Sequence, residues 1–80
     1  MMSFDRALSI VMKKNPDRQF TGKAFKYNGS YYIEMAPRGN KGAAIDSMFR
    51  VDGIRADVTN YNPVMDGVIK PWEMEPIRTR

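Results

Sequence analysis

The sequence predicts an α+β fold in which one N-terminal helix packs on a four-stranded antiparallel sheet, in the order α-β-β-β-β. Apolar residues recur with helical spacing over residues 3–14, and an Asn-Gly pair separates two apolar runs over residues 19–36. Two further runs, 47–51 and 57–61, alternate apolar and polar residues as strands do. We expect one domain over residues 1–66 and an irregular C-terminal tail over residues 67–80.

The composition excludes several classes of function. The chain of 80 residues is 42% hydrophobic and 28% charged, which is ordinary for a small globular domain. It contains no Cys and no His, so disulfides, Cys/His zinc sites, Cys nucleophiles and Ser-His-Asp triads are excluded. Thirteen basic residues against nine acidic ones give a net charge of +4.

The N-terminal helix is predicted over residues 3–14. Ser3 is a good N-cap, and Asn15-Pro16 ends the helix because proline disfavours α geometry in the residue before it. The apolar residues at i, i+3, i+4 and i+7 predict one buried face: Phe4, Ala7, Leu8 and Val11. We also expect three methionines to fill the core: Met12, Met35 and Met48.

The Asn28-Gly29 pair predicts a β-hairpin with a type I′ turn over residues 19–36. That turn pairs Tyr27 with Ser30 and fixes the register of both strands. The pairs that follow are Lys26 with Tyr31, Phe25 with Tyr32, Ala24 with Ile33, Lys23 with Glu34 and Gly22 with Met35. The face with Phe20, Gly22, Ala24, Tyr31, Ile33 and Met35 is assigned to the helix. The second face then carries Thr21, Lys23, Phe25, Tyr27, Tyr32 and Glu34.

The next two strands are expected to be joined by a turn over residues 52–56. A tighter hairpin at Asp52-Gly53 is the alternative. Asn62-Pro63 ends the fourth strand.

One stretch resembles a known group of proteins. It comprises residues 46–52, a five-residue turn, and the closing run Tyr61-Asn62-Pro63-Val64-Met65-Asp66. The pattern resembles short, mostly uncharacterised proteins of Gram-positive bacteria and their phages, with a single PepSY-like α+β unit. The turn departs from that pattern, because residues 53–57 replace a usual Lys/Thr/Gly-rich stretch. The resemblance implies the longer turn and no catalytic residue.

The second face is the candidate functional surface, with Lys23, Phe25, Tyr27 and Tyr32; Trp72 in the tail is a further anchor. Aromatic residues dominate protein interfaces, so we expect a non-enzymatic protein-interaction module. The resemblance above implies a phage or mobile-element accessory or inhibitor protein that binds a host or phage protein. The alternative is a single-stranded nucleic-acid-binding protein, in which the rings stack bases and lysines meet phosphates. Five basic residues between positions 13 and 26 favour it: Lys13, Lys14, Arg18, Lys23 and Lys26.

The combined area of three aromatic side chains on one face approaches or exceeds the contiguous apolar area that a monomer usually exposes. We therefore expect either a homodimer through Phe25, Tyr27 and Tyr32, or cover by the segment around Pro71-Trp72.

Other sites are not expected. Asp52, Asp57 and Asp66 lack calcium-loop spacing, and the glycines fit no phosphate-binding loop, so we expect no metal, no cofactor and no enzymatic activity. No apolar run approaches the ~18–20 residues of a membrane span, and the N-terminus does not read as a signal peptide. The expected location is the cytoplasm.

Overall fold

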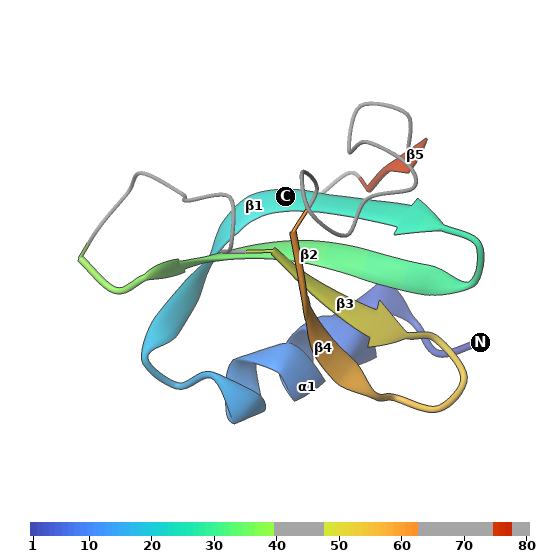
Figure 1. The fold of residues 1–80 in the computed structure, drawn as a ribbon, viewed down its shortest axis with the longest axis horizontal. Helices are drawn as coiled ribbons and strands as arrows, with labels where there is room; N and C mark the ends of the chain where they lie inside the picture. The colour runs from blue at the N-terminus through green and yellow to red at the C-terminus, as the bar shows by residue number, and fades with distance from the viewer. Residues whose placement is uncertain (40–47, 63–74, 78–80) are drawn as a thin grey trace.

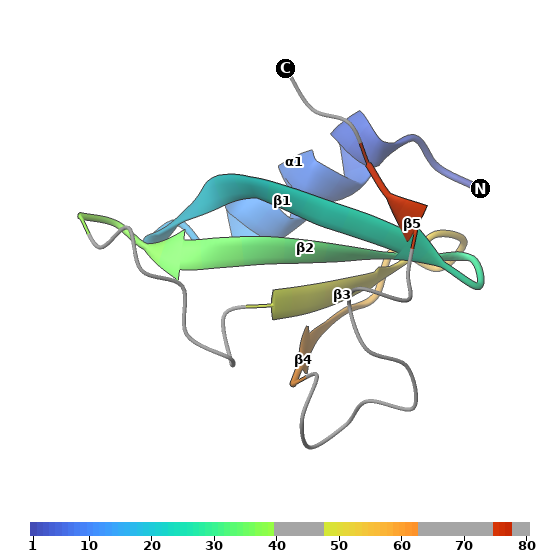
Figure 2. The ribbon, with the colours of Figure 1, turned by 90° about the horizontal axis from the view of Figure 1, so that it is seen from above.

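The computed structural model describes residues 1–39, 48–62 and 75–77, which form one helix and one antiparallel sheet. The helix α1 spans Phe4–Lys14. The strands are β1 (Arg18–Tyr27), β2 (Ser30–Pro37), β3 (Met48–Asp52), β4 (Val58–Tyr61) and β5 (Glu75–Pro76). They lie in the order β4-β3-β2-β1-β5, with α1 across one face (Figure 1). Figure 2 shows the same helix alongside the sheet from above. The predicted α+β class is confirmed.

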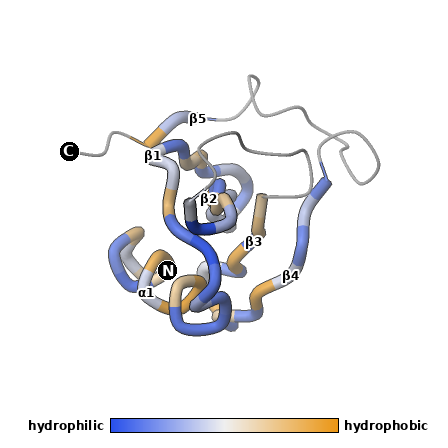
Figure 3. Tube along the Cα trace, turned by 90° about the vertical axis from the view of Figure 1, so that its left-hand side faces the viewer, coloured by the Kyte–Doolittle hydropathy of each residue, from blue (hydrophilic) through white to orange (hydrophobic). Residues whose placement is uncertain are grey.

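The helix α1 has the predicted bounds and caps. The Ser3 hydroxyl accepts a hydrogen bond from the Arg6 backbone N–H at 3.2 Å, which satisfies one unpaired donor of the first turn. At the other end, the Asn15 side-chain Nδ2 donates to the Val11 carbonyl at 3.0 Å. Ala7 and Val11 are completely buried against the sheet. Seen along the strands, α1 lies on one side of the sheet (Figure 3).

The hairpin of β1 and β2 has the predicted turn and, next to it, the predicted register. Asn28 and Gly29 have φ values of 49° and 78°, as a type I′ turn requires. The pairs from Tyr27 opposite Ser30 to Ala24 opposite Ile33 are confirmed.

Beyond Ala24 the predicted register is wrong. Phe20 lies opposite Met35, so the three residues 21–23 of β1 face Glu34 alone and form a β-bulge. Gly22 permits the bulge with a φ of 99°. The Thr21 hydroxyl donates to the Glu34 carboxylate at 2.8 Å and accepts from the Lys23 backbone N–H at 3.3 Å. The Glu34 carboxylate therefore accepts a hydrogen bond from Thr21. The predicted cross-strand pairs of Lys23 with Glu34 and of Gly22 with Met35 do not occur in the observed register.

The helix-side face of the sheet forms the main core. The two-residue length of the register shift keeps Phe20 and Ala24 on one face, so the predicted assignment of this face to the helix is confirmed for the large residues. The buried members are Ala7, Val11, Ala24, Tyr31, Ile33, Met35, Phe49 and Val51.

The sheet has five strands where four were predicted. Within the expected irregular tail, the described residues Glu75 and Pro76 pair with Lys26 and Phe25 of β1. The Ile77 backbone N–H donates to the Ala24 carbonyl at 2.9 Å, and its side chain packs on the main core. A two-residue strand that contains proline has no periodicity for a sequence pattern to reveal.

The longer turn between β3 and β4 is confirmed. The Asp52 backbone N–H donates to the Asp57 carbonyl at 2.9 Å, and the Ala56 N–H donates to the Asp52 carbonyl at 2.9 Å. The Asp52 carboxylate accepts from the backbone N–H groups of Ile54 at 2.8 Å and Arg55 at 2.9 Å. This aspartate thus holds the turn, as Asp side chains often do.

We expect Asp52→Asn to reduce the acid sensitivity of the fold. The backbone N–H groups of Arg55 and Ile54 are the main cause of the lowered pKa of Asp52. Desolvation opposes them, and the charges of Arg50 and Arg55 lower the pKa by smaller amounts. A lowered folded-state pKa contributes stability above the unfolded pKa, and this contribution is lost as pH falls through the folded pKa. The thermal midpoint of the variant should therefore fall less than that of the wild type between about pH 5 and about pH 2.

Circular dichroism melts at stepped pH measure this difference. Asp57→Asn removes a carboxylate from the same turn but leaves the Asp52 acceptor in place, and so separates the two effects. A wild-type pH slope in Asp52→Asn would contradict the assigned role.

The N-terminus is tied to two turns of the sheet. The Met2 backbone N–H donates to the Gly53 carbonyl at 2.8 Å, and the Gly53 N–H donates to the Gly29 carbonyl at 2.9 Å. The Tyr31 hydroxyl donates to the Met2 carbonyl at 2.9 Å. The hairpin turn, the β3–β4 turn and the residues before α1 are therefore joined in one hydrogen-bonded junction.

Candidate interaction surface

The face of the sheet opposite α1 carries the predicted aromatic surface. Phe25 lies directly opposite Tyr32, and Tyr32 lies opposite Arg50 of β3. In the next row Met48 lies opposite Tyr61 of β4. The register thus assembles side chains from four strands on this face.

Much of this face is a second, smaller core. We call Tyr32, Met48, Tyr61 and the partly buried Phe25 the second-face cluster. Tyr32 and Tyr61 meet edge to face, with ring centroids 4.8 Å apart and planes at 70°, a favourable aromatic arrangement. Tyr32 is 7% exposed and Tyr61 is 8% exposed. Tyr32 is therefore a packing residue within one chain rather than a freely presented ring.

The predicted site residues differ in their positions and in their exposure to solvent. Phe25 and Tyr32 are brought together, and Tyr27 follows at the turn end of the same face. Tyr27 is 40% exposed, while Phe25 is partly buried. Lys23 is exposed in the bulge and has left the predicted register. Trp72 lies outside the described residues. The exposed part of the surface is thus Tyr27 beside Phe25, which we call the aromatic edge.

Four of the five basic residues between positions 13 and 26 lie away from the aromatic edge, and the fifth, Lys23, is exposed in the bulge. Arg18 reaches over the Phe49 ring of the main core, with its guanidinium carbon 5.5 Å from the ring centroid, and donates from Nη1 to the Met35 carbonyl at 3.1 Å. Lys26 shares its row with Tyr31, which faces the helix. Lys13 and Lys14 end α1. The cations are distributed over different parts of the described chain.

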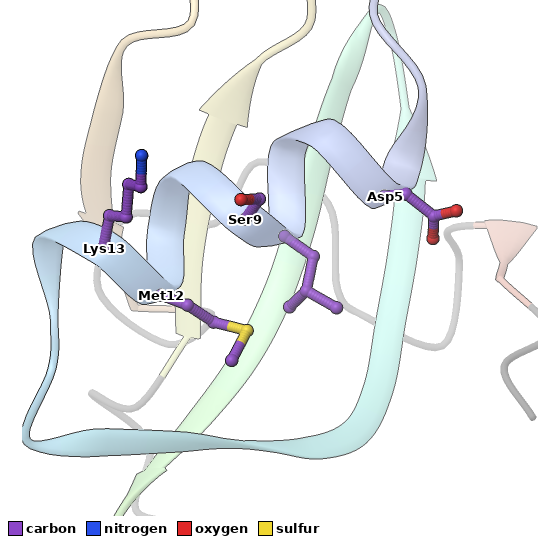
Figure 4. Close-up of a pocket in the computed structure, with 5 residues that line it drawn as sticks. Asp5, Ser9, Met12 and Lys13 are labelled. Carbon is purple, nitrogen blue, oxygen red and sulfur yellow. The ribbon is translucent and has the colours of Figure 1, made fainter.

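A shallow groove runs along α1, with a volume of about 390 Å³. It is lined by Asp5, Leu8, Ser9, Met12 and Lys13. Figure 4 shows Asp5 and Lys13 towards opposite ends of the helix, with Ser9 and Met12 between them. The groove was not predicted, because the sequence pattern assigned Met12 to the core. Met35 and Met48 are buried as predicted, but Met12 is 42% exposed.

Among residues 1–39, 48–62 and 75–77, no three metal-ligating side chains gather in one place. The carboxylate of Asp52 is engaged by two backbone N–H groups of its own turn. In the same part of the chain, no helix is long and apolar enough to cross a membrane.

The fold and this surface define a small α+β domain with a packed second face and an exposed aromatic edge. No protein-family model, curated protein or solved structure matches the chain. The resemblance to short proteins of Gram-positive bacteria and their phages stays a prediction.

Proposed function

We propose that this protein is a non-enzymatic interaction module that acts by binding another protein, as phage or mobile-element accessory and inhibitor proteins do. The observation that supports the proposal is the aromatic edge, where Tyr27 is 40% exposed beside the partly buried Phe25. Tyrosine contributes a large contact area and a hydroxyl, and it is enriched among the residues that dominate interface energetics. The phage or mobile-element role rests on the sequence resemblance alone.

The rigidity of the hairpin beneath Tyr27 supports binding. The turn at Asn28-Gly29 is fixed by the Gly53 N–H, which donates to the Gly29 carbonyl at 2.9 Å. Within the second-face cluster, the contact between Tyr32 of β2 and Tyr61 of β4 stabilises the strand that follows this turn. A surface that is ordered before binding loses less conformational entropy when a partner docks.

A protein partner is favoured over single-stranded nucleic acid. Base stacking needs open rings with cations alongside. Arg50 lies opposite Tyr32, and Lys23 is exposed in the bulge. Tyr32 itself, however, is buried in the second-face cluster, and Arg18 and Lys26 belong to the helix-side face. One exposed ring suits an anchor in a protein interface better than it suits a stacking platform for several bases.

We expect Tyr27→Ser to weaken binding of the partner by at least about tenfold, which is the size of effect typical of an interface anchor. Immobilised wild-type protein is used to capture host proteins, and affinity for the captured protein is then measured for each variant. Ile54→Ser is the matched control, because Ile54 is 81% exposed and lies in a different turn. Equal affinity of Tyr27→Ser and the wild type would contradict the proposed surface.

A further inference from the structure

The groove along α1 has a self-complementary distribution of charge. Asp5 lies in the first turn and Lys13 in the last turn of an 11-residue helix, with Leu8, Ser9 and Met12 lining the groove between them. Lys13 lies eight positions after Asp5, which corresponds to about 12 Å along the helix axis. The groove is therefore acidic at one end, basic at the other and partly apolar in the middle.

We propose that this groove binds the same groove of a second copy of the chain, with the two α1 helices antiparallel about a two-fold axis near Ser9. Such an axis brings Asp5 of one copy to the partner's Lys13, and it repeats the same contact at the other end. It also places Leu8 and the partner's Met12 about two residues, or ~3 Å, apart along the helix axis, so the two apolar side chains lie within reach of each other. One arrangement thus satisfies the charged ends and the apolar middle together.

The residues that line the groove are exposed or only partly buried in a single chain, as expected of a surface to which a partner binds. Met12 is 42% exposed although it is a large apolar residue, and Leu8 is only partly buried against the main core. Ser9 is exposed at the midpoint, and its small side chain allows two helices to approach closely. The second face is less suited to a dimer contact, because its central residue Tyr32 is already buried within a single chain, with only 7% of its surface exposed.

The contact should be weak. A helix of 11 residues is about 16 Å long, so a pair of such helices buries less surface than the ~800 Å² per partner of a standard interface. We expect a dissociation constant on the order of 0.1 mM, with faster exchange and stronger salt dependence than in an obligate dimer.

Reversal of the two charges tests the proposal. Asp5→Lys places two lysines against each other, and Lys13→Glu places two acidic residues against each other, so each variant should raise the dissociation constant by at least about tenfold. In an equimolar mixture of the two variants, both charged contacts are attractive again. The mixture should therefore form a heterodimer at concentrations where each variant alone is monomeric.

Sedimentation equilibrium over about 10 µM to about 1 mM measures these masses, and circular dichroism confirms that each variant is folded. If a charge variant does not fold, Met12→Ser replaces it, since Met12 is exposed and its change should abolish the dimer while leaving the fold intact. A monomeric wild type at every concentration, a mixture that stays monomeric, or a wild-type dimer in Met12→Ser would each overturn the proposal. Loss of the dimer in Tyr27→Ser alone would assign the contact to the aromatic edge and would also overturn it.

Discussion

Ile33→Ala is expected to lower the free energy of unfolding by about 2–5 kcal/mol, because it removes three methylene or methyl carbons and leaves a cavity in the main core. Ile33 is completely buried on β2, the middle strand of the sheet, between Ala24 of β1 and Phe49 of β3. A domain of this size has only a few kcal/mol of stability to lose. The thermal midpoint should fall by more than about 8 °C.

Thermal and urea unfolding followed by circular dichroism measure the loss. Ile54→Ala is the matched control, since it removes the same atoms from a side chain that is 81% exposed. The control should change stability by less than about 0.5 kcal/mol. Similar effects of the two substitutions would show that Ile33 is not a core residue.

Gly53→Ala is expected to destabilise the protein by about 1–3 kcal/mol through overpacking. A Cβ atom at this position would lie 2.5 Å from the Gly29 carbonyl oxygen and 2.8 Å from the Met1 Cγ. The Met1 side chain can move, but the Gly29 carbonyl belongs to the hairpin turn and accepts the Gly53 N–H. The substitution therefore forces the two turns apart and loosens the junction that includes Met2.

The effect is measured by thermal unfolding and by hydrogen exchange of the Met2 and Gly53 amides, which should lose protection. Ala56→Gly is the control within the same turn. Ala56 has a φ of 63°, so glycine relieves a strained conformation there and should change stability little or raise it slightly. Undiminished stability in Gly53→Ala would show that the two turns are not in close contact.

Local signals predicted the elements whose structure depends on neighbouring residues. Ser3 and Asn15-Pro16 determine where α1 begins and ends, and Asn28-Gly29 determines the hairpin turn. The bulge had a signal in Gly22, since an isolated glycine in a strand often marks one, but a register extended from the turn ignores it. The strand β5 depends on pairing between residues about fifty positions apart, which no local pattern reports.

The sequence predicted which residues form the candidate surface, but not which of them are exposed. The alternation of β1 and β2 places Phe25, Tyr27 and Tyr32 on one face, as expected. The burial of Tyr32 follows from Tyr61, which β4 brings to it, and that contact depends on the folded sheet. Met12 was predicted to be buried but is exposed, because its position on the helix lies at the border of the buried face and the sheet does not cover it.

The bulge at residues 21–23 also bears on how the protein avoids aggregation. The outer edge of a straight strand offers regularly spaced N–H and C=O groups on which a foreign strand can assemble. In β1 the bulge bends this edge, and beyond it the edge is paired with Glu75-Pro76 of β5, where the proline nitrogen has no hydrogen to donate. The side of the sheet formed by β1 and β5 is therefore a poor template for fibril growth, although β1 itself is ten residues long and rich in aromatic residues.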